Sequence, residues 1–248
     1  MAAPTFVTSI EPTSNWGSTA IGAVRTTGSF SVLAGDVLVV VEATENSTFT
    51  STTPTGGSLT WTSVKAAAFS DINEADVRSW TATVDVDKSM TFSLTAATGT
   101  GARSWGFVVY QFRGSAGVGA SAITEQNSGS TNASQALTTL AANSAILAIS
   151  ADWNAIDGAT RTWATINSVT PTSGNGLERI YFRNASAYTV YSAYWSDVGA
   201  TGSKSAGVSA PTGQRNSIIA IEIKGSTSVS PVAKRVIIPQ ARVRAAFW

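Results

Sequence analysis

The chain has 248 residues, a net charge of +1 and 12% charged side chains, and this length suits one large all-β domain or two small ones. It contains no histidine and no cysteine, which excludes Ser-His-Asp and Cys-His nucleophilic chemistry, disulfides and nearly every zinc site. The first residues lack a signal peptide pattern, and no apolar run approaches the roughly 18 residues of a membrane span. We expect a soluble protein that is made in the cytoplasm and has no membrane span.

Short segments rich in β-branched and aromatic residues follow one another along the chain, separated by Gly, Pro, Asp or Asn. Such segments are typical of strands, and no stretch carries a 3.6-residue period that would predict a helix. The sequence therefore predicts an all-β protein. In chain order, clear strand signals lie at 35–43, 59–64, 77–84, 90–95 and 105–112.

The order of these segments then recurs in the second half of the chain. GDVLVVVEATEN aligns without gaps on NSAILAISADWN, and FVVYQFRG matches IIAIEIKG. A pattern written twice indicates two similar structural units. The matching pairs are 35–46 with 143–154, Trp61 with Trp163, and 107–114 with 218–225.

Neither half contains enough strands to cover both faces of a sheet. We therefore predict that the two half-repeats close on each other around one shared core, as a single jelly-roll β-sandwich with Trp61 and Trp163 in equivalent places. Two independent small sandwiches are the alternative. The predicted organisation is an N-terminal segment (1–27), the jelly-roll β-sandwich (28–225, with half-repeats 28–114 and 136–225) and an extended C-terminal linker and tail (226–248).

The tail differs from the rest of the chain in charge. Residues 1–223 hold eleven Lys and Arg against fifteen Asp and Glu, a balance of −4, whereas 224–248 hold five Lys and Arg and no acid, a balance of +5. From Ala241 onward, apolar residues alternate with arginines, which predicts a strand with one apolar and one largely basic face.

We predict that this tail docks on a partner chain by adding a strand to a sheet edge with acidic side chains. A tail that folds back on its own acidic body is the alternative. The predicted docking residues are Arg235, Ile237, Ile238, Pro239, Arg242, Val243, Arg244, Phe247 and Trp248.

Several segments together resemble a β-sandwich family that is common in phages of actinobacteria and is labelled minor tail or virion structural protein. The resemblance covers about residues 28–225 and is carried by GDVLVVVEATEN, GGSLTWTSV, VVYQFRG, ISADWNAIDGATRTW, YTVYSAYWSDVGATGSKSAGVSAPTGQ and IIAIEIKG. It implies a non-enzymatic jelly-roll component of the virion, with other virion proteins as partners. A capsid decoration or head-fibre protein, and a carbohydrate-binding module for host-surface adhesion, are the alternatives.

Carboxylates are the only catalytic groups that the composition leaves. A glycosidase needs two of them about 5 to 9.5 Å apart in a cleft, and the candidate pairs are Glu42 with Glu45 and Asp152 with Asp157. We favour the reading that these acids cap backbone amides at strand ends, and therefore predict no enzyme and no cofactor. Calcium is weakly indicated at the segment SDINEAD (70–76). This segment offers oxygen ligands but lacks the glycine and the distant glutamate of an EF-hand loop.

Carbohydrate and nucleic acid are two kinds of partner that the body could bind. Asp152, Trp153 and Asn154 lie where a strand ends, and an aromatic beside amide and carboxylate groups is typical of a site for host cell-surface carbohydrate. The alternative, which we favour, is that Trp153 packs at the rim of the core. Nucleic acid is not expected as a partner, because the basic residues lie in one short tail.

The low charge and the aromatic residues on both faces of 188–196 predict that copies of the chain cover one another. We expect a closed homo-oligomer, with a trimer favoured.

Overall fold

The computed structural model describes residues 2–46, 50–67, 75–99 and 101–226. These residues form nineteen strands and no helix, so the prediction of an all-β protein is confirmed. Within this part of the chain there is accordingly no helix long and apolar enough to cross a membrane. All strand pairs in the sheets are antiparallel.

Residues 5–113 form a first unit, here called the N-terminal sandwich. Its large sheet has the order β1-β11-β5-β8-β7, with β2 also paired to β11, and a small sheet β3-β10-β6 and the pair β4-β9 complete it. The strands are β1 (Thr5–Ile10), β2 (Ser18–Thr19), β3 (Val24–Thr26), β4 (Phe30–Val32), β5 (Val37–Thr44), β6 (Thr50–Ser51), β7 (Thr62–Ala67), β8 (Asp76–Thr83), β9 (Lys88–Met90), β10 (Ser93–Thr98) and β11 (Arg103–Arg113).

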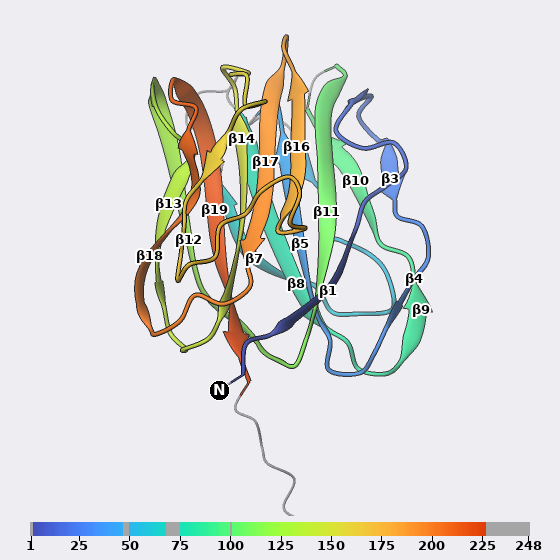
Figure 1. Ribbon diagram of the computed structural model, residues 1–248. Coiled ribbons are helices and arrows are strands. Elements are labelled where there is room, and N and C mark those ends of the chain that lie inside the picture. Colours follow the sequence, from blue (N-terminus) through green and yellow to red (C-terminus); the bar gives the residue numbers. More distant parts are fainter. Residues whose placement is uncertain (1, 47–49, 68–74, 100, 227–248) are drawn as a thin grey trace, which may run out of the picture.

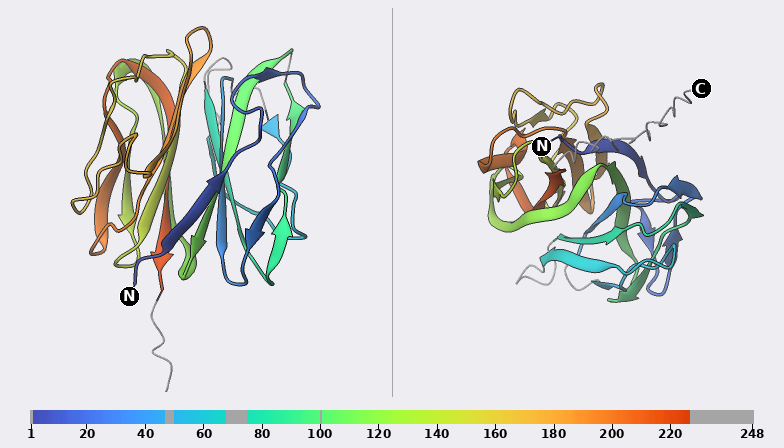
Figure 2. Two further views of the ribbon diagram at one scale, coloured as in Figure 1. Left: turned by 45° about the vertical axis from the view of Figure 1, so that its right-hand side comes forward. Right: turned by 90° about the horizontal axis from the view of Figure 1, so that it is seen from below.

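Residues 115–225 form a second unit, the C-terminal sandwich, with a large sheet β12-β19-β14-β17-β16 and a small sheet β13-β18-β15. Figure 2 shows the two units side by side. The strands are β12 (Ser115–Thr131), β13 (Ser134–Thr139), β14 (Ala145–Asp152), β15 (Thr162–Trp163), β16 (Glu178–Asn184), β17 (Tyr188–Trp195), β18 (Gly202–Ala210) and β19 (Gln214–Gly225).

Three hydrophobic cores hold the layers together. One lies inside the N-terminal sandwich, one lies inside the C-terminal sandwich, and a third is made by the two large sheets facing each other. Strand β5 shows how: Leu38 and Val40 belong to the core of their own sandwich, whereas Val39 and its alternate neighbours belong to the central core. Because side chains alternate across a strand, a strand with both faces buried carries a continuous apolar run, as β5 does at Val37 to Val41 and β14 does at Ala145 to Ile149.

This layering corrects the prediction that the two halves share one core in a single sandwich. Each large sheet is covered on one face by its own small sheet and on the other face by the large sheet of the other unit. The N-terminal segment 1–27 does more than lead into a sandwich, because it supplies β1, β2 and β3. The units therefore begin earlier than the predicted half-repeats.

The two tryptophans expected in equivalent places lie in different elements. Trp61 immediately precedes β7, an edge strand of a large sheet, whereas Trp163 lies in β15 of a small sheet. Each ring nevertheless packs edge-on in the core of its own sandwich, with centroids 4.9 Å apart for Trp61 and Phe92 and 5.8 Å apart for Trp163 and Trp195.

Both ends of the described chain meet at one end of the molecule (Figure 1). The backbone N–H of Ala2 donates to the carbonyl of Ser226 over 3.0 Å, and the N–H of Ser226 donates to the carbonyl of Ala2 over 3.1 Å. Ser226, the last described residue, therefore lies at the end of the body where β1 begins and β19 finishes.

Candidate functional site

The three residues predicted to bind a glycan do not form one open surface. Asp152 is fully buried, and its Oδ1 accepts hydrogen bonds from the backbone N–H groups of Asn154 over 3.0 Å and Arg215 over 2.9 Å. Its Oδ2 accepts a third from the N–H of Ile156 over 2.9 Å. This carboxylate shapes the turn after β14 and does not face a ligand.

Its two neighbours face different surroundings. Trp153 is partly buried and packs against the central core, as the favoured alternative predicted. Asn154 is exposed, and its Nδ2 donates to the carbonyl of Gly213 over 2.8 Å.

The candidate catalytic pairs are not arranged as pairs. Glu42 is buried inside the N-terminal sandwich, where its Oε2 accepts a hydrogen bond from the Ser51 hydroxyl over 2.6 Å, whereas Glu45 is partly exposed beyond the end of β5. Asp157 is exposed and accepts hydrogen bonds from the N–H of Ala159 over 2.9 Å and the hydroxyl of Tyr181 over 3.0 Å. Asp152, the last residue of β14, is buried, so neither pair has two carboxylates facing one cleft.

A buried charged cluster surrounds Glu42. The guanidinium of Arg78 donates to Asp76 Oδ2 over 2.8 Å, and Arg78 is the cross-strand partner of Glu42. Burial raises the pKa of Glu42 to about 7 and that of Asp76 to about 7, although the charge of Arg78 opposes both shifts. This cluster was not expected from the sequence.

The oxygen-rich segment 70–76 is described only from Ala75 onward, and most of it lies outside the described residues. No group of three or more acidic side chains placed to hold a metal ion occurs in the described part of the chain. The predicted docking residues from Arg235 to Trp248 also lie outside the described residues.

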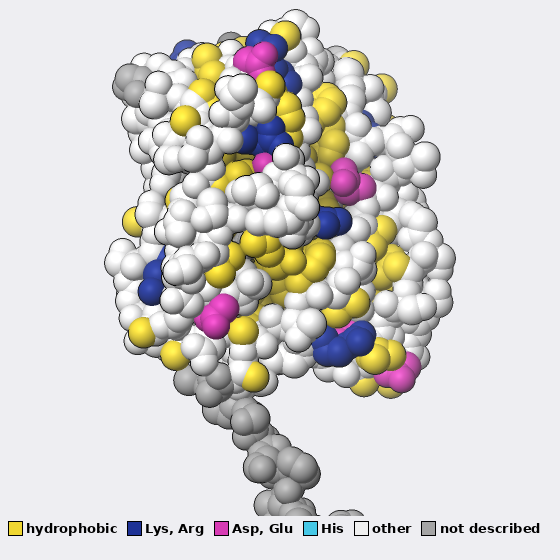
Figure 3. All heavy atoms as spheres, viewed as in Figure 1, with side chains coloured by type: hydrophobic (Ala, Val, Ile, Leu, Met, Phe, Trp, Pro, Cys, Tyr) yellow, Lys and Arg dark blue, Asp and Glu magenta, His cyan; other side chains and the backbone are white. Residues whose placement is uncertain are grey.

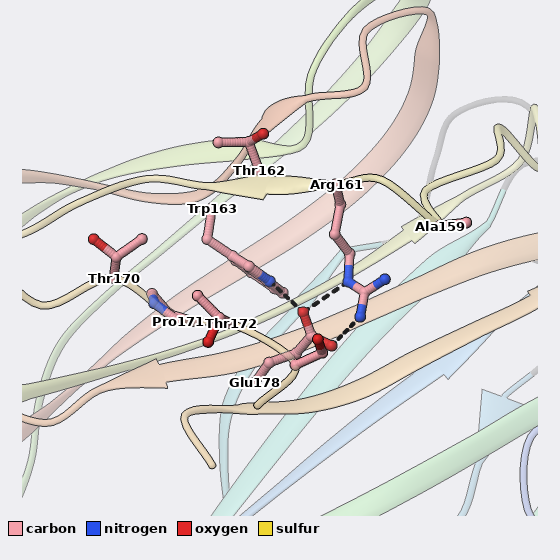
Figure 4. A pocket seen from close by; sticks show the side chains of 9 residues that line it. Ala159, Arg161, Thr162, Trp163, Thr170, Pro171, Thr172 and Glu178 are labelled. Carbon is pink, nitrogen blue, oxygen red and sulfur yellow. Dashed lines mark hydrogen bonds and ion pairs between the residues drawn. The ribbon is translucent and has the colours of Figure 1, made fainter. Parts of the chain in front are cut away.

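A pocket of about 200 Å³ lies on the C-terminal sandwich, between β15, the start of β16 and the segment 170–173 (Figure 4). Its lining combines hydroxyl groups, small apolar groups, the edge of a tryptophan and an ion pair. The lining residues are Ala159, Arg161, Thr162, Trp163, Thr170, Pro171, Thr172, Ser173 and Glu178.

The carboxylate of Glu178 is the polar centre of this pocket. Its Oε2 accepts hydrogen bonds from Arg161 Nε over 2.7 Å and from the Trp163 indole N–H over 2.6 Å, and its Oε1 pairs with Arg161 Nη2. Figure 4 shows Arg161 and Trp163 pointing together toward Glu178. Only 9% and 7% of the Arg161 and Glu178 side chains are exposed, so the three groups hold one another in fixed positions.

The arginine is held from its other sides as well. Arg161 Nη1 donates to the carbonyl of Gly158 over 3.0 Å, and the guanidinium lies 4.1 Å from the ring centre of Tyr181. Tyr181 in turn stacks on Tyr191 at 5.8 Å.

The outer rim of the pocket is braced by Asn175. Its Oδ1 accepts hydrogen bonds from the N–H groups of Thr172 over 3.0 Å and Leu177 over 3.1 Å, and its Nδ2 donates to the carbonyl of Thr170 over 2.7 Å. These hydrogen bonds fix the conformation of the loop from Thr170 to Leu177. The hydroxyls of Thr172 and Ser173 lie at its exposed rim.

Sequence reasoning missed Arg161 and Glu178. They are separated by 17 positions, and each is an isolated charge in an otherwise ordinary strand-and-turn segment. Comparisons with protein-family models, curated proteins and solved structures find no match for this chain.

Proposed function

We propose that this chain is a non-enzymatic structural protein of a phage virion, a minor tail component whose β-body is displayed on the particle and whose C-terminal segment anchors it. The observation that carries this proposal is the meeting of Ala2 and Ser226 at one end of the body. A segment that leaves there, with a balance of five cations and no acid over 224–248, can hold that end against a partner while the opposite loops face outward. A capsid decoration or head-fibre protein would use the same geometry.

We further propose that the body is a duplicated jelly roll. Both sandwiches place their strands in corresponding orders, β1-β11-β5-β8-β7 against β12-β19-β14-β17-β16 and β3-β10-β6 against β13-β18-β15. In the C-terminal sandwich consecutive strands alternate between the large and the small sheet, apart from β16 and β17, which both belong to the large sheet. In the N-terminal sandwich the chain also passes between the two sheets, from β5 through β6 to β7 and β8 and again from β10 to β11. Such repeated exchange between two facing antiparallel sheets is typical of jelly rolls.

The environments of the buried acids support a structural role. Asp152 accepts three backbone hydrogen bonds at the turn after β14. Glu222 accepts from the backbone N–H groups of Ala120, Leu140 and Ala141 and from the Ser144 hydroxyl. Carboxylates that accept several hydrogen bonds from their own chain hold loops in place. They are poorly placed to attack or protonate a substrate.

Assembly as a closed homo-oligomer, with a trimer favoured, belongs to the same proposal. The face seen in Figure 3 has few charged side chains and a central area of hydrophobic ones. Among the large hydrophobic side chains, Val24, Val86 and Leu140 are 59%, 55% and 69% exposed. Contiguous apolar surface is typical of a face that another chain covers, and light scattering across a concentration series measures the stoichiometry.

Deletion of residues 231–248 tests the anchoring role. We expect the truncated body to melt at nearly the temperature of the full chain, because every described strand ends at or before Gly225, and we expect it to be missing from particles. The matched control changes only the four cations of the segment, Lys234, Arg235, Arg242 and Arg244, to Gln, which separates loss of charge from loss of a strand. Normal incorporation of the truncated protein, or unfolding of its body, contradicts the proposal.

Carbohydrate recognition is the second candidate function, and the pocket around Glu178 is the observation that favours it.

A further inference from the structure

We propose that the pocket around Arg161, Trp163 and Glu178 binds one neutral pyranose ring, as a glycan site distinct from the Asp152–Asn154 turn predicted from the sequence. This inference deepens the second candidate function and is independent of incorporation into particles. It rests on the charge balance of the pocket, its remaining hydrogen-bonding capacity, its size and its fixed shape.

The charge balance selects a neutral ligand. An anion would need a cation that is not already neutralised, but the guanidinium of Arg161 is paired with Glu178 through Nε and Nη2. A cation would need a carboxylate with no counter-charge, and Glu178 is held by the same arginine. Because the two charges cancel, the lining has no net charge, which suits a neutral ligand with hydroxyl groups.

The remaining hydrogen-bonding capacity matches a pair of sugar hydroxyls. A carboxylate has about four lone-pair sites and a guanidinium has five N–H donors. Glu178 accepts three hydrogen bonds, and Arg161 uses three of its side-chain N–H groups among the described residues. One acceptor site of Glu178 and two N–H groups of Arg161 therefore remain on two residues that both line the pocket, and a sugar can use them by donating one hydroxyl to Glu178 and accepting with another from Arg161.

The rest of the lining suits the faces and rim of a sugar. Pro171, Ala159 and the edge of Trp163 offer apolar contact for C–H groups, while the hydroxyls of Thr162, Thr172 and Ser173 surround them. The volume of about 200 Å³ lies below the roughly 300–1,000 Å³ of pockets for drug-sized ligands. A single ring fits this volume, and further sugar units would extend over the rim.

The pocket is fixed before a ligand arrives. Glu178 is positioned by three donors, and the rim is braced by the side chain of Asn175. A fixed site loses little conformational entropy when it binds, which matters for a ligand that makes few contacts.

The test uses saturation-transfer NMR on the full chain with a panel of methyl pyranosides, together with the indole N–H resonance of Trp163 as a reporter of Glu178. Thr172→Tyr should fill the pocket, and because Thr172 is exposed this variant should keep the fold. The matched control is Thr60→Tyr, which fills a hollow of about 420 Å³ on the N-terminal sandwich that is lined by Ser58, Thr60, Thr81 and neighbouring residues. Glu178→Gln is the second variant, because it keeps the shape of the side chain and removes its charge.

We expect at least one methyl pyranoside to receive saturation and to shift the Trp163 indole resonance, in the original chain and equally in Thr60→Tyr. The signal should disappear in Thr172→Tyr, and the dissociation constant should rise about tenfold in Glu178→Gln, as for a lost hydrogen bond to a charged group. The proposal is overturned if no pyranoside gives a signal, or if the signal persists in Thr172→Tyr. Neither result bears on whether the tail anchors the protein in a particle.

Discussion

Gln111 on β11 and Glu222 on β19 each hydrogen-bond to the residue that immediately precedes a central strand of their own large sheet. Gln111 Nε2 lies 2.6 Å from Asp36 Oδ2 before β5, and Ser144 Oγ lies 2.8 Å from Glu222 Oε1 before β14. The carboxylate thus stands on the loop in one sandwich and on the neighbouring strand in the other. In both cases the same turn also donates a backbone N–H, from Leu33 or from Ala141, over 2.9 Å.

Replacing Glu222 should therefore destabilise the C-terminal sandwich. Glu222→Gln removes a charge that accepts three backbone N–H groups and a hydroxyl, and we expect it to lower the free energy of unfolding by about 1–3 kcal/mol at pH 7. Chemical denaturation measures the change. Glu125→Gln, an exposed acid on β12, is the matched control, and equal effects of the two substitutions would contradict the structural role.

The same carboxylates set an acid limit to stability. Hydrogen bonds from backbone amides and Ser144 outweigh burial and hold the pKa of Glu222 below its ordinary 4.5, and hydrogen bonds from Arg113, Leu33 and Gln111 hold the pKa of Asp36 below 3.8. A lowered pKa in the folded state means that this stabilisation is present above the unfolded pKa and is lost as pH falls through the folded pKa. Denaturation between pH 5 and pH 2 should show a steady loss, smaller in Glu222→Gln than in the original chain.

Glu42 should act in the opposite direction. Burial raises its pKa from 4.5 to about 7, so between these values the folded state binds more protons than the unfolded chain and stability falls as pH rises. Above about pH 7 both states have released the proton and the dependence levels off. We expect Glu42→Gln to lose less stability than the original chain between pH 5 and pH 8. An unchanged slope in Glu42→Gln would show that this side chain is not the titrating group.

The central core should couple the two sandwiches. The hydroxyl of Tyr110, on β11, lies 2.7 Å from the hydroxyl of Ser192, on β17, and Ser192 also donates to the carbonyl of Ala148 over 2.9 Å. Tyr110→Phe should lower the free energy of unfolding by about 1 kcal/mol. A double-mutant cycle with Ser192→Ala should give a non-additive result, because the two side chains are in contact across the two units. Additive effects would mean that the contact contributes nothing measurable.

Neither sandwich should fold stably alone. Removing the N-terminal sandwich would expose Leu147, Ile149, Ile219, Ile221 and their neighbours on the large sheet of the C-terminal one. Burial of such side chains contributes about 1.5–3 kcal/mol each. Exposing several of them together therefore costs a free energy comparable with the whole 5–15 kcal/mol stability of a typical domain. Residues 115–226 expressed alone should aggregate or melt without a cooperative transition, and a sharp reversible melt would contradict the shared central core.

Strands with strong apolar character were predictable from the sequence, whereas the layering was not. The segments 35–43 and 105–112 correspond closely to β5 and β11, because Val and aromatic runs bounded by turn residues have few other solutions. The long strand β12 gave no signal, since it is rich in Gly, Ser and Ala and relies on pairing with β19 through three register shifts. An apolar run such as Val37 to Val41 predicts a strand that is buried on both faces. It does not show whether the second face is covered by another half-sheet or by a complete sandwich.

The candidate site was less predictable than the fold. Asp152, Trp153 and Asn154 stand out in the sequence because three functional residue types are adjacent, yet β14 ends at Asp152 and the turn that follows places Trp153 and Asn154 in different surroundings. Arg161, Trp163 and Glu178 meet only because β15 and the start of β16 flank the same loop. Their proximity follows from tertiary packing, so the three residues show no recognisable spacing pattern in the sequence.

An image reconstruction of the virion would show whether this chain is a structural protein anchored by its C-terminal segment. We expect density that fits the two packed sandwiches, with the end carrying Ala2 and Ser226 directed toward the particle and further density running from Ser226 onto a neighbouring chain. A particle that lacks this body, or one in which the opposite end faces the particle surface, would contradict a tail-anchored structural protein.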